Sequence, residues 1–314
     1  MGKTCGSSCE SKKSTCGSKN AAVAQQDVAI ATSLGRIKNK ILVMSGKGGV
    51  GKSTVSTNLA LGLAERGYKV GLMDVDLHGP DICRMLNLTA RLSDMEKSGG
   101  LVPPMSYGKN LKVISLEYMM ENRDDPIIWR GPLKIQAIRQ FIADLDWGEL
   151  DYLIIDAPPG TGDEPLTVAN TIKDAQALVV TTPQEVALAD VRKSLNFCKH
   201  VKMKVLGLVE NMSGLVCPHC NKTVDLFKSG GGRKTADDFK VPFLGSIPLD
   251  PKVVLGGDSG NPYLVSQAES PAIQAFKNLV DNVEKSRATS VSLASVTKEC
   301  GCGSGGCDPA TCDC

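Results

Sequence analysis

The chain has 314 residues, of which 42% are hydrophobic and 22% charged, and its formal net charge is +2, so it can bury a sizeable core and offers no polybasic face for nucleic acid. It contains no run of eighteen apolar residues, and its first twenty residues lack the apolar centre of a signal peptide. We therefore expect a cytoplasmic protein that binds neither nucleic acid nor membranes.

Cysteines are concentrated at the two ends of the chain. Of twelve in total, three lie in the first 16 residues and five in the last 15, in segments rich in Gly, Ser and Lys. Because reductants of the cytosol keep thiols free, this number favours metal binding over a disulfide scaffold. We expect flexible Cys-containing tails over residues 1–27 and 288–314, on either side of one folded domain over residues 28–287.

Short apolar runs alternate with helical segments through the middle of the chain. The runs begin at residues 41, 70, 111, 152, 177, 205 and 243, and each has the composition of a buried parallel strand. Between them, the segments 53–67 and 132–145 carry apolar residues at helical spacing. This alternation predicts an α/β fold with a doubly wound, mostly parallel sheet of about seven or more strands, whose ligands bind at the carboxyl ends of the strands.

A phosphate-binding loop follows the first predicted strand. Residues 46–53 match the pattern G-x-x-x-x-G-K-[ST], with a strand before and a helix after. The glycines let backbone N–H groups turn toward phosphate oxygens, Lys52 supplies a positive charge, Ser53 suits Mg²⁺, and Thr54 can bond a phosphate. The predicted nucleotide-binding residues are Gly46, Lys47, Gly48, Gly49, Val50, Gly51, Lys52, Ser53 and Thr54.

Carboxylates follow two further predicted strands. Asp74 and Asp76 come after the second, and Asp156 comes after the fourth. We expect Asp156 to hold Mg²⁺ together with Ser53, and Asp76 to orient the attacking water. The bound nucleotide is expected to be ATP, because the guanine-specific N-K-x-D pattern is absent: the nearest match, "NKTVD" at residue 221, is one residue too long.

Cys217 and Cys220 form a Cys-x2-Cys pair, which is half of a four-ligand site. A two-fold axis would bring two such pairs together, because an isologous interface presents the same patch from both subunits. Zinc or a 4Fe-4S cluster would each be satisfied by four thiolates, and the residues alone leave both open.

The segment "SGKGGVGKST" carries an extra lysine, Lys47, directly after its first glycine. It resembles the deviant Walker A motif of the MinD/ParA-like dimeric ATPases. The resemblance implies a homodimer that sandwiches nucleotide, with Lys47 reaching the partner's phosphates. On its own, Lys47 reads equally well as a solvated surface lysine.

Longer segments narrow the resemblance. "IIWRGPLKIQAIRQF", "WGELDYLIIDAPPGTGDEPLTVAN", "GLVENMSGLVCPHC" and "GGGRKTADDFKVPFLGSIPLDPKV" are similar to the Mrp/ApbC family of iron-sulfur cluster carrier ATPases, over residues 37 to 276. The resemblance implies that Cys217 and Cys220 are cluster ligands, that Asn211 contacts adenine, and that the segment from Ile247 lies near the base. The tail cysteines depart from the family pattern, so a second cluster, zinc or no ligand stay open for them.

The resemblance implies an ATP-hydrolysing carrier that binds a 4Fe-4S cluster at a homodimer interface and transfers it to apoproteins. An upstream cluster donor is compatible with that role. Lys47, Lys52 and Asp76 are the expected catalytic residues. Two alternatives stay open: a MinD/ParA-like positioning ATPase with structural zinc at the cysteine pair, and an ATP-dependent reductase similar to the nitrogenase iron protein.

Overall fold

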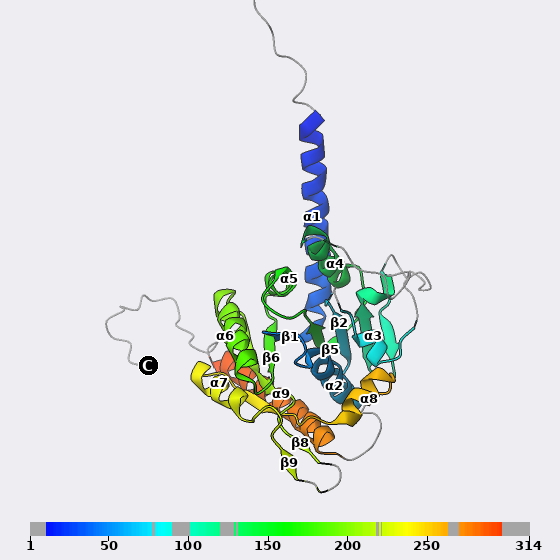
Figure 1. Ribbon diagram of the computed structural model, residues 1–314. Helices are drawn as coiled ribbons and strands as arrows, with labels where there is room; N and C mark the ends of the chain where they lie inside the picture. The colour runs from blue at the N-terminus through cyan, green and yellow to red at the C-terminus, as the bar shows by residue number, and fades with distance from the viewer. Residues whose placement is uncertain are drawn as a thin grey trace, which may run out of the picture.

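The computed structural model describes residues 11–76, 79–89, 101–119, 129, 131–217, 220, 222–262 and 270–296, with side chains described between residues 23 and 287 (Figure 1). An eight-stranded sheet forms the centre of the molecule. Its spatial order is β10 (Phe243–Ser246), β7 (Lys204–Glu210), β6 (Gln176–Thr181), β1 (Ile37–Ser45), β5 (Leu150–Asp156), β2 (Val70–Asp74), β4 (Leu111–Ser115) and β3 (Met105–Tyr107).

All neighbouring strands of the sheet are parallel except β3, which pairs antiparallel with β4 at the edge. The seven apolar runs predicted as strands are the seven parallel strands. The predicted fold class, α/β with a doubly wound, mostly parallel sheet, is confirmed. The edge strand β3 and a separate two-stranded hairpin, β8 (Leu215–Val216) and β9 (Thr223–Val224), were not predicted.

Helices cover both faces of the sheet and bury two apolar clusters against it. One cluster takes side chains from α1 (Ser11–Gly35), α4 (Gly131–Ala143), α5 (Asp163–Thr171), α6 (Glu185–His200) and α7 (Gly231–Phe239). The other takes them from α2 (Lys52–Glu65), α3 (Ile82–Met85) and α9 (Pro271–Val296). A short 3-10 helix, η2 (Leu116–Met119), follows β4, and α8 (Pro251–Asp258) follows β10. Because both faces are buried, the central strands carry the continuous apolar runs seen in the sequence.

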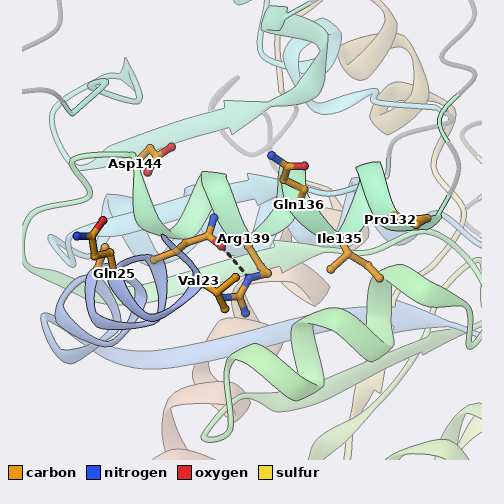
Figure 2. A pocket seen from close by; sticks show the side chains of 9 residues that line it. Val23, Gln25, Pro132, Ile135, Gln136, Arg139 and Asp144 are labelled. Atoms are coloured by element: carbon orange, nitrogen blue, oxygen red, sulfur yellow. Dashed lines mark hydrogen bonds between the residues drawn. The ribbon is translucent and has the colours of Figure 1, made fainter. Parts of the chain in front are cut away.

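The N-terminal helix α1 lies beside α4, and its first half projects from the body (Figure 1). Arg139 of α4 donates a hydrogen bond to Gln26 of α1 (3.1 Å) and forms an ion pair with Asp27. Figure 2 shows the cavity of about 610 Å³ between the two helices, with Val23 and Gln25 on one side and Ile135 and Gln136 on the other. None of the residues that line it belongs to the predicted site.

Two helices cross the predicted domain boundaries. Residues 11–27, predicted as part of a flexible tail, belong to α1, and α9 continues past residue 287 to Val296. The division into one domain and two tails remains a prediction. No helix in the described part of the chain has the length and apolar character needed to cross a membrane.

Candidate nucleotide and cysteine sites

The glycine loop joins β1 to α2 and is open to ligand. Gly49 and Gly51 adopt φ values of 77° and 79°, a left-handed conformation that favours glycine. A Cβ at Gly46 would lie 2.3 Å from a backbone atom of Asp190 in α6, so only glycine allows this approach. Lys47, Gly48 and Gly49 are exposed, while Val50 is buried. The loop therefore presents its outer backbone at the start of α2, where the helix dipole favours an anion.

A buried network holds the first turn of α2 against the end of β5. The Lys52 ammonium lies 2.9 Å from Asp156 Oδ2, and the Ser53 hydroxyl donates to the same oxygen at 2.7 Å. Ser56, one turn later, donates to Asp156 Oδ1 at 2.6 Å and was not predicted. Burial acts to lower the pKa of Lys52, but the surrounding carboxylates, Asp156 foremost, raise it above its ordinary value.

The two carboxylates after β2 lie on the same network. Asp76 Oδ2 is 3.8 Å from the Lys52 ammonium. Asp74 is buried, and it accepts hydrogen bonds from the backbone N–H of Asp76 (3.0 Å) and from the Ser115 hydroxyl (3.2 Å). Burial, followed by the nearby charge of Asp156, raises the pKa of Asp74 well above its usual range. Three carboxyl groups, those of Asp74, Asp76 and Asp156, thus act on the charge of one lysine, and Asp156 lies nearer to its ammonium than Asp76 does.

Asn211 follows β7 and lies beside the glycine loop. Its backbone N–H donates to Thr181 O (2.7 Å), and its side-chain Nδ2 donates to Val50 O (2.9 Å). A Cβ at Gly51 would lie only 2.2 Å from that Nδ2 atom. The structure therefore brings Asn211 against the phosphate loop, and a glycine at position 51 is needed to admit its amide.

Glu210, the last residue of β7, organises the segment that carries the cysteine pair, and no motif in the sequence marks it. Its buried carboxylate accepts hydrogen bonds from Ser213 Oγ (2.6 Å), Gly230 N (3.0 Å) and Gly232 N (2.5 Å). Ser213 stands at the start of the excursion between β7 and α7, and the two glycines stand at its end. One side chain therefore closes both ends of the cysteine-bearing segment.

The cysteine pair lies on the hairpin β8–β9, which projects from the body at the end opposite to the start of α1 (Figure 1). Cys217 is half-buried and its N–H donates to Lys222 O (3.0 Å), whereas Cys220 is exposed. Within the described residues, no three His, Cys, Asp or Glu side chains gather where they could hold a metal ion. The chain thus carries one exposed and one half-buried thiol on this hairpin.

The remaining cysteines fall into two groups. Cys83 and Cys198 are buried in the apolar core, where burial raises the pKa of each thiol to about 12. They therefore remain protonated thiols at neutral pH and pack as small core residues. The side chains of the tail cysteines (Cys5, Cys9, Cys16, Cys300, Cys302, Cys307, Cys312 and Cys314) lie outside the described residues.

Comparison with known proteins gives a family and several relatives. A ParA family profile, described as the NUBPL iron-transfer P-loop NTPase, matches residues 36–284. The iron-sulfur cluster carrier protein of Methanocaldococcus jannaschii is 46% identical over 282 residues, which cover 88% of this chain and 96% of the relative. The cytosolic Fe-S cluster assembly factor CFD1 of Kluyveromyces lactis is 51% identical over 71% of this chain and 80% of its own.

Solved structures give a consistent result. A nucleotide-binding protein of Archaeoglobus fulgidus in complex with ADP is 37% identical with a TM-score of 0.68, over 80% of this chain and 96% of that one. The cell division ATPase MinD of Pyrococcus furiosus is 25% identical with a TM-score of 0.58, over 79% and 98%.

Proposed function

The chain belongs to the NUBPL iron-transfer P-loop NTPase family, and from this premise we propose that it is an ATP-hydrolysing carrier of iron-sulfur clusters. The family resemblance predicted from the sequence is confirmed. The relatives named as a cluster carrier and as an assembly factor favour the carrier function over the positioning ATPase and the reductase.

One observation carries the proposal: a short hydrogen-bonded path joins the phosphate loop to the cysteine pair. Asn211 contacts Val50 in the loop, and the following residues pair with the segment after β10. Ser213 N donates to Ile247 O (2.9 Å), Leu249 N donates to Gly214 O (2.8 Å), and Leu215 forms a bridge with Leu249. Cys217 follows two residues later. A change at the loop on ATP binding can therefore reach the cargo ligands through a few backbone contacts.

The nucleotide chemistry follows from the side chains at the loop. The backbone of residues 46–54 would cradle the phosphates, Lys52 would neutralise them, and Asn211 would contact adenine. Ser53 and Asp156 would hold Mg²⁺, which neutralises charge on the transferred phosphoryl group. Asp76, near the Lys52 ammonium, would orient the attacking water.

A homodimer completes both sites in this proposal. Two pairs of Cys217 and Cys220 across a two-fold axis supply four thiolates, which suit a 4Fe-4S cargo. Lys47 is exposed at the loop and would reach the partner's nucleotide, as a second cation does in other phosphoryl-transfer enzymes. ATP would then favour one arrangement of the two subunits. Because the affinity for the cluster would differ between the two arrangements, ATP would change how tightly the dimer holds its cargo.

The cargo determines the partners. Recipients would be apoproteins whose cysteines replace Cys217 and Cys220 on the iron, and an upstream donor would supply the cluster. Several relatives carry the word cytosolic in their names, which supports our expectation of a cytoplasmic location.

The test is reconstitution with iron and sulfide in the absence of oxygen. We expect the dimer to show the broad visible absorbance of a cluster, to contain about four irons and four sulfides per dimer, and to release the cluster at a rate that ATP changes. Cys198→Ala is the matched thiol control and should load normally. A colourless protein with stoichiometric zinc would overturn the carrier function in favour of the zinc alternative.

A further inference from the structure

The Ser115 hydroxyl lies beside the carboxylates of the phosphate site, and no step of the proposed reaction uses it. Ser115 is the last residue of β4, and it pairs with Asp74, the last residue of β2, in the parallel register of the two strands. Its side chain is fully buried. A buried hydroxyl needs partners for its proton and its lone pairs, so its hydrogen bonds define what it does.

Two hydrogen bonds fix the direction of this hydroxyl. The backbone N–H of Glu117, in η2, donates to Ser115 Oγ (3.2 Å), and the Ser115 hydroxyl donates to Asp74 Oδ2 (3.2 Å). The hydroxyl has a single proton, and the N–H of Glu117 takes up one of its lone pairs. The turn after β4 therefore aims the Ser115 proton at Asp74.

Asp74 passes this constraint to residue 76. While Ser115 holds Oδ2 of Asp74, the other oxygen, Oδ1, accepts the backbone N–H of Asp76 (3.0 Å). The backbone between them is held from the opposite side, because Val75 N donates to Asp156 O at the end of β5 (2.9 Å). The strands β4 and β5, which flank β2, therefore both fix the backbone just after its end.

This backbone carries the acid that orients the attacking water in the proposed function. The Asp76 side chain is 14% exposed, and its Oδ2 atom lies 3.8 Å from the Lys52 ammonium. A change in the backbone of residue 76 moves this carboxylate, and a displacement of about 1 Å at a catalytic group can cost about 10²-fold in rate. The position of Asp76 thus depends on groups that do not touch the nucleotide.

We propose that Ser115 is a positioning residue for ATP hydrolysis: acting through Asp74, it holds Asp76 where that carboxylate orients the attacking water. The inference rests on the proposed function, since it deepens the role of Asp76. Without the hydroxyl, Asp74 Oδ2 loses this donor, and the carboxyl group can rotate and release the N–H of Asp76. Ser115 therefore acts on turnover and leaves ATP binding unchanged.

The experiment measures phosphate release by the full-length protein, with kcat and KM determined separately and ATP affinity measured by direct binding. Ser115→Ala should lower kcat about tenfold and leave KM and ATP affinity within about twofold, because it misplaces a group that acts in the transition state. Ser115→Thr keeps the hydroxyl and should retain more than half of the wild-type kcat.

A double variant separates positioning from a general effect on the structure. Asp76→Asn alone should lower kcat by about 10²-fold. Adding Ser115→Ala should cost no more than about twofold further, since the group that Ser115 positions no longer acts. A tenfold loss on both backgrounds would overturn the inference, because Ser115 would then act independently of Asp76. This comparison decides the question whether or not threonine fits the buried position.

The matched control is Thr235→Val. Thr235 on α7 is also buried, and its hydroxyl donates to Gly231 O (2.9 Å) within the same helix, which packs on β7 and β10 at the other edge of the sheet from β4. The variant removes one buried hydroxyl and should keep the wild-type kcat. Urea unfolding is recorded for every variant. Equal losses of kcat in Thr235→Val and Ser115→Ala would overturn the inference.

The remaining outcomes separate this inference from the proposed function. A wild-type kcat in Ser115→Ala would overturn the inference alone. A raised KM with unchanged kcat would also overturn it, because Ser115 would then serve nucleotide binding. Wild-type protein that hydrolyses no ATP would overturn the hydrolytic part of the proposed function together with this inference.

Discussion

The phosphate site and the cysteine hairpin differ in how completely one chain builds them. At the phosphate site, the side chains of Lys52 and Asp156 are 7% and 1% exposed and are fixed at hydrogen-bond distance in the centre of the sheet. The hairpin has strands of two residues each, and Cys220 is exposed. A buried, preformed site suits a small substrate that diffuses in. A cargo that passes from one protein to another needs ligands that the second protein can reach, as an exposed hairpin provides.

The largest expected effect comes from removing the buried cation. Lys52→Ala should lower ATP turnover by about 10³-fold or more, because the charge on the outer phosphates loses its compensation. Turnover is measured by phosphate release, and the fold is checked by circular dichroism. Lys40→Ala is the matched control, since the Lys40 side chain is also 7% exposed and pairs with Asp174 at 2.7 Å, outside the site.

The two lysine variants distinguish a catalytic from a structural role. Both remove a buried ammonium from an ion pair, so both should lose stability. If Lys40→Ala lost as much turnover as Lys52→Ala, the assignment of Lys52 to the phosphates would be wrong.

Removing one thiol should abolish the cluster and leave the nucleotide site intact. In the proposed homodimer, Cys217→Ser or Cys220→Ser would remove two of the four cluster ligands, so the visible absorbance should be lost even with both tails present. ATP affinity should stay within about twofold, because the cysteines lie at the β8–β9 hairpin and the predicted phosphate-binding residues lie between β1 and α2. If deleting the tails removed the iron and these substitutions did not, the primary cluster site would lie in the tails.

A smaller effect is expected where the two regions meet, at Glu210. In the wild type, the Glu210 carboxylate accepts hydrogen bonds from the backbone N–H groups of Gly230 and Gly232. Glu210→Gln keeps the shape of the side chain but replaces one carboxylate oxygen by an NH₂ group, which cannot accept them. The hairpin should loosen, and cluster loss to an iron chelator should accelerate about 10-fold to 100-fold, the usual effect of altering groups that orient metal ligands.

The control for Glu210 is Glu164→Gln, which alters another buried carboxylate, paired with Lys134 at 2.8 Å away from the hairpin. Its cluster should be retained at the wild-type rate. Equal acceleration in both variants would indicate general destabilisation and remove the specific role of Glu210.

The sequence predicted the features that recur along the chain and missed those that depend on tertiary contact. Seven strands were recognised because burial on both faces produces apolar runs, while β3, β8 and β9 contain only two or three residues and show no such pattern. Ser56 had a signal, since it lies three residues after Ser53 on α2 and faces the same carboxylate. Glu210 had none, because its role arises only when the end of β7 meets the start of α7.

The smallest expected effect concerns the free energy of unfolding. The raised pKa of Asp74 means that the nucleotide-free folded state holds this proton more tightly than the unfolded chain. The free energy of unfolding should therefore fall as the pH rises from the ordinary pKa of Asp toward the raised pKa of Asp74. Asp74→Asn should remove this decrease in stability. At pH 7 the variant should be more stable by on the order of 1 kcal/mol, the usual size of a gain from relieving a functional site.

Urea unfolding at pH 5 and pH 8 measures the free energy of unfolding of Asp74→Asn and of the wild type. Asp151→Asn is the control, because its effect on stability at neutral pH should have the opposite sign. A hydrogen bond from Lys38 and another from the backbone of Lys69 lower the pKa of Asp151, so its contribution to stability is present above the ordinary Asp value and is lost in acid. We expect Asp151→Asn to be the less stable protein at neutral pH. If the free energy of unfolding of Asp74→Asn and of the wild type changed equally between pH 5 and pH 8, ionised Asp74 would not destabilise the folded protein. The phosphate site would then differ from the hairpin in burial alone.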